Sequence, residues 1–212
     1  MKGLYVITAE VPHLGRTHLD VVRAAVSGGA RVIQVREKNK VRDALSIARE
    51  IRRLTRGTGV KFVVNDRVDI AQAADADGVH LGQGDTEISE ARRMLGDDKI
   101  IGVSATCLDE AVEAEALGAD YVGVGPIFPT PSKTDAAEPI GCRALREIRK
   151  RVRLPLVAIG GITIENLEEV LASGADSVAV ISAVANASDM EAAVRDLVGK
   201  ISIIAKSIER RA

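Results

Sequence analysis

The chain has 212 residues, of which 46% are hydrophobic and 28% charged, and its formal net charge is -1 at pH 7. These values are typical of a soluble globular protein of one domain, and the balanced charge and few aromatic residues argue against nucleic acid as a partner. No apolar run approaches the roughly 20 residues that span a bilayer, and the chain starts with a strand pattern in place of a signal peptide, so we expect no membrane partner and a cytoplasmic location.

Short apolar runs rich in Val and Ile recur along the chain, and each is followed by an amphipathic stretch long enough for a helix. This alternation is typical of βα units around a parallel sheet. The expected strands are Leu4–Thr8, Arg31–Val35, Lys61–Val64, Gly78–Leu81, Ile100–Val103, Tyr121–Val124, Leu156–Ile159 and Ser177–Val180. Eight such units predict an α/β protein with the (β/α)8 TIM-barrel fold, as a single domain over residues 1–212.

The alternative architecture is an open, doubly wound sheet. The Gly-x-Gly-x-x-Gly fingerprint of that fold is missing after the first strand, where the sequence reads Thr8-Ala9-Glu10-Val11-Pro12. A Gly-Ala pair precedes three of the expected strands, at Gly29, Gly118 and Gly174. We expect these glycines to end the preceding helices in the left-handed backbone region, which is a structural role.

Polar residues follow the second expected strand in the segment Gln34–Lys38. Gln34, Arg36 and Lys38 alternate, so they point the same way if the strand continues. Two cations and an amide donor suit a diphosphate. The alternative is that Arg36, Glu37 and Lys38 are a solvated run of charge.

One acid stands just after each of the next two strands, at Asp66 and Asp85. If the two strands are neighbours in a parallel sheet, both carboxylates leave the same edge and can converge on a hard cation such as Mg²⁺. The alternative is that each Asp is the N-cap of the helix that follows it, near Arg67 and near Thr86 respectively.

Hydroxyl groups and a lysine follow the fifth and sixth strands. Ser104 comes after the fifth, and the sixth leads into an irregular stretch, Gly125–Ile140, that contains four prolines and the run Thr130-Pro131-Ser132-Lys133. A long loop after a barrel strand is usually a lid or a binding loop. The stretch Gly125–Ile140 lacks the Gly-Lys-Ser/Thr ending of a nucleotide P-loop.

The last two strands end in Gly160-Gly161-Ile162-Thr163 and in Ile181-Ser182-Ala183, each just before a helical pattern. Backbone amides at such helix starts form the phosphate site common after strands seven and eight of TIM barrels. For the Gly-Gly pair alone, a simple tight turn is the alternative.

Together these clusters indicate two phosphorylated substrates and a magnesium site between two acids. No nucleophile-base pair can be assigned to His13, His18 or His80, so covalent catalysis is disfavoured.

In this order the clusters resemble the thiamine phosphate synthase family, from Tyr5-Val6-Ile7-Thr8 to Ile181-Ser182-Ala183. The resemblance implies a pyrimidine diphosphate site made of Gln34, Val35, Arg36, Glu37, Lys38, Asn65, Ser104 and Lys133. It implies a thiazole phosphate site made of Thr130, Pro131, Ser132, Gly161, Ile181 and Ser182. The acids Asp66 and Asp85 would bind Mg²⁺. Ser132 replaces a frequent Thr and Val35 a frequent Leu, and both keep the relevant chemistry.

The implied reaction transfers a pyrimidine from 4-amino-2-methyl-5-hydroxymethylpyrimidine diphosphate to the nitrogen of thiazole phosphate, carboxylated or not. The products are thiamine phosphate and diphosphate. Lys133, Ser104 and Arg36 are the expected catalytic residues, because charge develops on the departing diphosphate. A thiazole tautomerase-like isomerase or a non-catalytic phosphate-binding barrel are the alternatives, and a homo-oligomer is left open.

Overall fold

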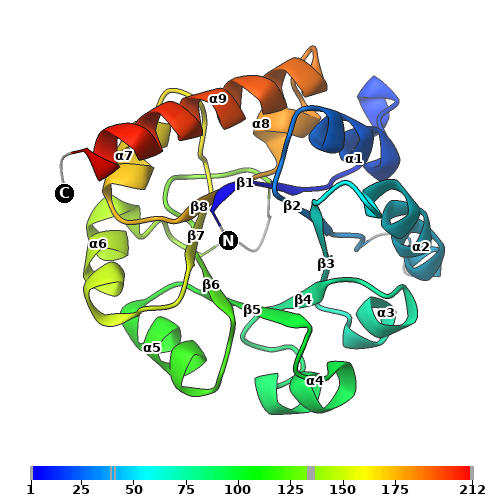
Figure 1. Ribbon diagram of the computed structural model, residues 1–212, viewed down its shortest axis with the longest axis horizontal. Helices are drawn as coiled ribbons and strands as arrows, with labels where there is room; N and C mark the ends of the chain where they lie inside the picture. Colours follow the sequence, from blue (N-terminus) through cyan, green and yellow to red (C-terminus); the bar gives the residue numbers. More distant parts are fainter. Residues whose placement is uncertain (1, 39, 41, 133–136, 211–212) are drawn as a thin grey trace.

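A computed structural model describes residues 2–38, 40, 42–132 and 137–210. Eight parallel strands form a closed barrel in chain order, with the last strand paired to the first (Figure 1). The strands are β1 Gly3–Ile7, β2 Val32–Val35, β3 Lys61–Asn65, β4 Gly78–Leu81, β5 Ile100–Ala105, β6 Tyr121–Val124, β7 Leu156–Ile159 and β8 Ser177–Val180. The predicted (β/α)8 fold is therefore confirmed.

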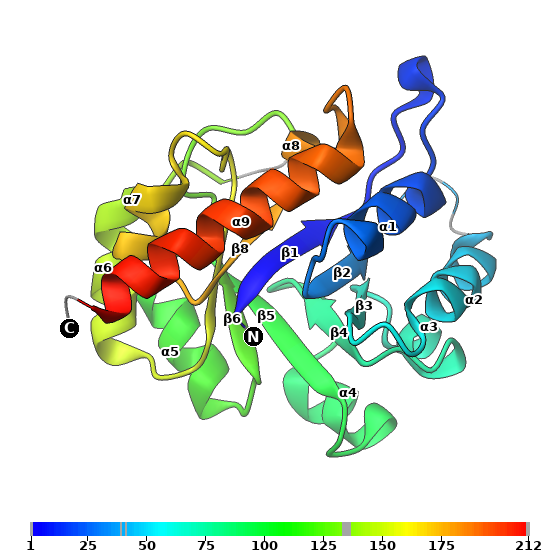
Figure 2. The ribbon, with the colours of Figure 1, turned by 45° about the horizontal axis from the view of Figure 1, so that its top comes forward.

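Helices surround the barrel (Figure 1). They are α1 His18–Ser27, α2 Ala44–Thr55, α3 Val68–Ala73, α4 Ile88–Leu95, α5 Leu108–Ala116, α6 Gly141–Arg151, α7 Leu167–Ala172, α8 Ser182–Ala185 and α9 Met190–Glu209, with a 3-10 turn, η1, at Pro12–Leu14. Helix α9 packs against β1, α1 and α7 and covers the seam where the barrel closes (Figure 2). No described helix is long and apolar enough to cross a membrane.

Glycines end three of the βα repeats as expected. Gly29, Gly118 and Gly174 have φ angles of 88°, 86° and 101° and follow α1, α5 and α7. A residue with a Cβ is strained in this region of the backbone, so glycine at each turn lets the chain leave the helix and enter the next strand.

Alternate residues of each strand point to opposite sides of the barrel wall, and this separates two cores. The outer core lies between the strands and the helices and includes Val6, Ile33, Val79 and Val103. The inner core fills the barrel. Its buried members are Tyr5, Ile7, Val32, Val63, Tyr121, Val157 and Ala179. Residues on the inner register at the carboxyl ends of the strands therefore face the mouth of the barrel.

Candidate active site

A chain of hydrogen bonds crosses the barrel interior and joins five strands; we call it the barrel network. Gln34 Nε2 donates to the Tyr5 hydroxyl at 2.8 Å, and the Tyr5 and Tyr121 hydroxyls lie 2.9 Å apart. His80 Nδ1 is 2.8 Å from the Tyr121 hydroxyl, and His80 Nε2 is 2.9 Å from Ser104 Oγ. The network thus runs from the buried Gln34 to the partly exposed Ser104.

Two glycines on the inner register make room for the rings of the barrel network. A Cβ on Gly102 would lie 2.0 Å from Cζ of Tyr121, and a Cβ on Gly123 would lie 2.8 Å from Cε1 of His80. The Tyr121 and His80 rings stack with their centroids 5.4 Å apart. The sequence therefore has glycines where the barrel must hold aromatic rings across its width.

The ionisable groups of the barrel network are neutral at physiological pH. Burial lowers the pKa of His80 to about 4, although the charge of Asp85 acts in the opposite direction. Burial also raises the pKa of Tyr5 and Tyr121 above the ordinary value of a phenol. The two tyrosines therefore place no negative charge beneath the mouth, where an anionic substrate would bind.

The acids Asp66 and Asp85 lie next to each other at the ends of β3 and β4, and we call them the acid pair. Burial, and then the neighbouring Asp85 carboxyl, raise the pKa of Asp66, whereas Lys38 lowers it from 3.4 Å away. Two carboxylates in contact repel each other unless a cation lies near them. The donor set of the acid pair therefore fits a divalent metal ion that prefers oxygen ligands.

The alternative role of these acids as helix N-caps is wrong. The N-cap of α3 is Arg67 and that of α4 is Glu87, and neither helix has a side-chain cap. Asp85 Oδ2 instead accepts a hydrogen bond from the Gly82 amide at 2.7 Å, which closes the turn after β4. Asp66 has a φ of 61°, so the backbone turns sharply at the candidate metal ligand.

The charged side chains of the segment after β2 point in different directions, and the solvated-charge alternative is wrong for Glu37. The Glu37 side chain is only 3% exposed and lies 3.0 Å from His18 Nε2. It also accepts from the Lys40 amide at 2.7 Å. Lys38 points the other way, to Asp66, and Val35 is buried in the outer core. Glu37 and Val35 therefore support the site from behind.

A second group of metal-ligand type, Glu10, His18 and Glu37, has its ligand atoms within 4.8 Å of one another. These atoms already have partners in the protein. His18 Nδ1 is 2.6 Å from Thr8 Oγ1, and Lys40 Nζ lies 2.8 Å from Glu10. The group ties the loop after β1 to the segment after β2.

On the opposite side of the mouth, the loop after β6 meets the ends of β7 and β8. Ser132 Oγ donates to Ser182 Oγ at 3.2 Å, and the Ser132 amide donates to Thr130 Oγ1 at 3.2 Å. A Cβ on Gly161 would lie 2.5 Å from the Pro129 carbonyl oxygen. We call Thr130, Ser132, Gly161 and Ser182 the serine corner. The predicted phosphate residues of three separate strands thus lie together.

The sequence predicts that a helix starts just after Gly160–Thr163 and another just after Ile181–Ala183, and only the second prediction is close to the structure. Helix α8 begins at Ser182, but α7 begins at Leu167, after a turn. In that turn the Thr163 amide donates to Asn166 Oδ1 at 2.9 Å. Gly160 and Gly161 have φ angles of 98° and 60°, so the tight-turn alternative describes the backbone there. The Gly161 amide donates to no residue that the structure describes.

The remaining predicted residues divide between the core and the loop after β6. Ile181 packs against the inner core, and Asn65 pairs in register with His80 at the mouth. The loop is irregular over its described residues, as expected, and is anchored where the Ile127 amide donates to the Ile159 carbonyl at 2.8 Å. Lys133 lies outside the described residues.

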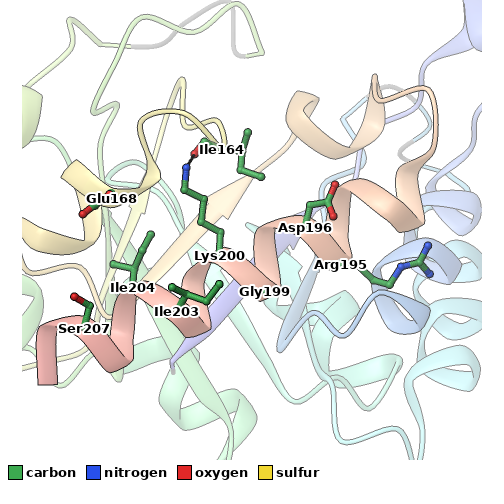
Figure 3. Close-up of a pocket in the computed structure, with 9 residues that line it drawn as sticks. All are labelled: Ile164, Glu168, Arg195, Asp196, Gly199, Lys200, Ile203, Ile204 and Ser207. Carbon is green, nitrogen blue, oxygen red and sulfur yellow. Dashed lines mark hydrogen bonds between the residues drawn. The ribbon is translucent and has the colours of Figure 1, made fainter. Parts of the chain in front are cut away.

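A groove on the outer surface is a different kind of feature. It lies along α9 beside the turn before α7, and Lys200 Nζ donates there to the Ile164 carbonyl at 2.6 Å (Figure 3). Its lining mixes the exposed Ile203 with Glu168 and Arg195. Most of its lining comes from α9 and none of the predicted site residues is part of it, so we do not assign it to the candidate active site.

Sequence reasoning set His80 aside and missed Tyr5 and Tyr121. The available signal was register: Gln34, His80 and Ser104 share the inner face with the two tyrosines once alternation is applied to every strand. The contacts themselves join residues up to 116 positions apart in the chain, so no local pattern indicates them.

The chain is similar to known proteins over almost its whole length. The sequence model of a family described as "Thiamine monophosphate synthase" matches residues 4–184. The thiamine-phosphate synthase of Chloroflexus aurantiacus is 52% identical over 201 residues, which are 94% of this chain and 93% of that protein. That of Methanoregula boonei is 53% identical over 200 residues, or 94% and 93% of the two chains.

Solved structures give the same result. The thiamine phosphate pyrophosphorylase of Pyrococcus furiosus superposes with a TM-score of 0.86 at 44% identity, covering 95% of this chain and 96% of that one. A 3-hexulose-6-phosphate synthase superposes with a TM-score of 0.68 at 19% identity, covering 94% and 99%, and shares the fold alone.

Proposed function

Because this chain belongs to the thiamine monophosphate synthase family, and is a transferase that condenses a pyrimidine diphosphate with a thiazole phosphate, we propose how its own residues perform that reaction. The acid pair and Lys38 bind the diphosphate end of one substrate, and the serine corner binds the phosphate of the other. The barrel network lies beneath both.

The acid pair is the proposed magnesium site. It offers carboxylate oxygens at the mouth of the barrel, and the pKa of Asp66 is raised by burial and then by the Asp85 carboxyl, although Lys38 acts in the opposite direction. Magnesium bound there would neutralise charge on the diphosphate oxygens and favour their departure.

The diphosphate requires donors as well as a metal site. Arg36 and Lys38 supply positive charge from the end of β2, Asn65 and Ser104 supply an amide and a hydroxyl, and Lys133 is proposed to supply a further charge. One N–H of Gln34 is committed to Tyr5, so its carboxamide oxygen is left for the pyrimidine.

The thiazole phosphate is proposed to bind at the serine corner. The hydroxyls of Thr130, Ser132 and Ser182, and the Gly161 amide, which donates to no described residue, are donors suited to a phosphate. Pro131 and Ile181 shape this side of the mouth. Ser132 and Ser182 follow different strands, and the contact between their hydroxyls places the two donors side by side.

In the proposed mechanism the bond between the pyrimidine methylene carbon and the diphosphate oxygen breaks, and both electrons leave with the oxygen. The electron-rich aminopyrimidine supports the resulting cation. The lone pair of the thiazole nitrogen then forms the new carbon–nitrogen bond. Charge grows on the departing oxygen, so Ser104, Arg36 and Lys133 act by stabilising it, and no protein nucleophile is required.

The observation that carries this proposal is the contact between Asp66 and Asp85 beside Lys38. We expect purified protein to form thiamine phosphate from the two substrates with Mg²⁺ and to stop when EDTA is added. Asp66→Asn and Asp85→Asn should each lower kcat by about 100-fold or more, the scale of a lost electrostatic contact in a transition state.

Asp69→Asn is the matched control, because Asp69 is a neighbouring acid that is exposed and paired with Arg67. It should keep its activity. Near-normal turnover by both acid-pair variants would show that the metal site lies elsewhere. Isomerisation of the thiazole phosphate without any pyrimidine substrate would favour the tautomerase alternative.

A further inference from the structure

The barrel network also has a direction, and this inference rests on the proposed function. We propose that Gln34, Tyr5 and Tyr121 hold His80 as the tautomer with its proton on Nε2, so that Ser104 accepts from His80 and offers its own hydroxyl proton to the departing diphosphate. His80 is then a positioning residue for Ser104.

Counting protons gives the direction. Gln34 Nε2 donates to the Tyr5 oxygen, which leaves the single Tyr5 proton for Tyr121. The single Tyr121 proton then goes to His80 Nδ1, the only acceptor left to it among the described residues. Nδ1 is therefore unprotonated, and the proton of the neutral ring is on Nε2, where it is donated to Ser104.

The opposite tautomer leaves a buried proton without a partner. If Nδ1 carried the proton and donated it to Tyr121, either the Tyr5 or the Tyr121 hydroxyl would have no acceptor among the described residues. Both tyrosines are at most 1% exposed, so bulk water does not reach their hydroxyls. A buried unsatisfied donor costs about 1–3 kcal/mol, which favours the Nε2 tautomer.

Reversing the whole network would require the Gln34 amide to turn and accept from Tyr5. Ser104 would then donate inward to His80 and present only lone pairs to the mouth. Lone pairs repel a diphosphate, whereas a hydroxyl proton stabilises it. The inferred direction is therefore the one that suits an anionic leaving group.

The surroundings hold Ser104 and His80 in place. The Ser104 carbonyl accepts from Gln83 Nε2 at 2.7 Å, and the His80 ring stacks on Tyr121. Gly123 provides the space for the ring, since a Cβ there would lie 2.8 Å from His80 Cε1. The stacking on Tyr121 and the contact with Ser104 therefore hold the His80 ring in this position.

The tautomer can be measured without substrate by ¹⁵N NMR of the imidazole nitrogens. The chain has three histidines, and the His80 signals are those missing in His80→Gln. We expect an unprotonated Nδ1 that accepts a hydrogen bond and a protonated Nε2. Tyr121→Phe should move the Nδ1 signal to that of a nitrogen without a hydrogen bond. Tyr5→Phe, which removes an equal hydroxyl one link further away, should leave Nδ1 accepting. A protonated Nδ1 in the wild-type protein would overturn the inference.

Kinetics test whether His80 acts through Ser104. Ser104→Ala should lower kcat by about 100-fold, as expected for one lost donor to a developing oxyanion, with a smaller change in the pyrimidine diphosphate KM. His80→Asn should lose most of the same factor because its side chain is too short to reach Ser104, and His80→Gln should recover part of it. In the double variant Ser104→Ala/His80→Asn, kcat should equal that of Ser104→Ala alone.

The positioning role of His80 would be refuted if the fold loss in kcat of the double variant equalled the product of the two single losses. Equal activity of His80→Gln and His80→Asn would also refute it. Circular dichroism of each variant shows whether it is folded. If a variant is unfolded, the tautomer measured by NMR in the wild-type protein still decides the direction of the protons. A wild-type protein without transferase activity would refute the proposed function but leave the tautomer result intact.

Discussion

Asp66 combines a left-handed backbone with a carboxyl that lies against a second carboxyl. Its φ is 61°, a conformation that Asp and Asn tolerate better than most residues. Its pKa is raised by burial and then by Asp85. Both features oppose the stability of the metal-free protein, and this is typical of residues kept for function.

We therefore predict that Asp66→Asn stabilises the metal-free protein at neutral pH. A carboxyl whose folded pKa is raised is least costly when protonated, so stability falls as pH rises from the ordinary value of 3.8 through the raised value. The Asn side chain does not ionise, so the variant does not lose stability as the pH rises. Each kcal/mol by which its free energy of unfolding exceeds that of the wild-type protein would raise Tm by about 2–4 °C. Thermal unfolding with EDTA from pH 3.5 to 8 should show the two proteins diverging as pH rises.

Added Mg²⁺ provides the second half of this test. It should raise the Tm of the wild-type protein, because a ligand that binds only the folded state stabilises it, and should leave Asp66→Asn unchanged. Equal responses of the two proteins to Mg²⁺, or a lower Tm for the variant at pH 8 in EDTA, would contradict the account.

Strands β5 and β6 each have a glycine on the inner register, Gly102 and Gly123 respectively. Gly102 makes room for Tyr121 on the adjacent strand β6, and Gly123 makes room for His80 on β4, two strands away. The aromatic rings can then lie across the barrel and reach one another. Helix α9 has a glycine of another kind, since a Cβ on Gly199 would meet nothing within 4 Å.

The same substitution should thus have opposite effects at the two positions. Gly102→Ala should destabilise the protein by about 1–3 kcal/mol, because the added methyl overlaps the Tyr121 ring. Gly199→Ala should stabilise it by about 0.5–1 kcal/mol, because alanine favours a helix interior. Urea denaturation of both variants provides the comparison, and changes of the same sign would show that the packing around Gly102 is looser than described.

Closure of the barrel places the two halves of the site on opposite sides of one mouth. The acid pair and Lys38 belong to β2–β4, and the serine corner belongs to β6–β8. The barrel network joins the two sides beneath the mouth through β1, β2, β4, β5 and β6. Two phosphorylated groups can bind there without sharing ligands.

Separate halves predict separate losses of affinity. Ser182→Ala should weaken thiazole phosphate binding by about tenfold, the scale of one hydrogen bond to a charged group, and should leave Mg²⁺-dependent binding of diphosphate unchanged. Asp85→Asn should weaken the Mg²⁺-dependent binding of diphosphate and leave thiazole phosphate binding unchanged. Calorimetric titration of each ligand into each folded variant measures this. Parallel losses of both ligands in both variants would indicate a single shared site.

The sequence by itself determined the architecture and the edge where the site lies. Apolar runs and amphipathic stretches alternate locally, and four of the eight strands, β4, β6, β7 and β8, have the predicted bounds. Polar residues after those runs must meet at one end of a parallel barrel, so Asp66 and Asp85 could be placed together before any coordinates.

Only the tertiary structure decided which of those residues touch. Glu37 turns back to His18, α7 starts beyond Gly161, and Tyr5 meets Tyr121 across 116 positions of sequence. These contacts depend on closure of the sheet and on the space that Gly102 and Gly123 leave inside it. Local propensity acts between near neighbours in the chain, whereas the direction of the barrel network is set by side chains that only the closed barrel brings within hydrogen-bonding distance.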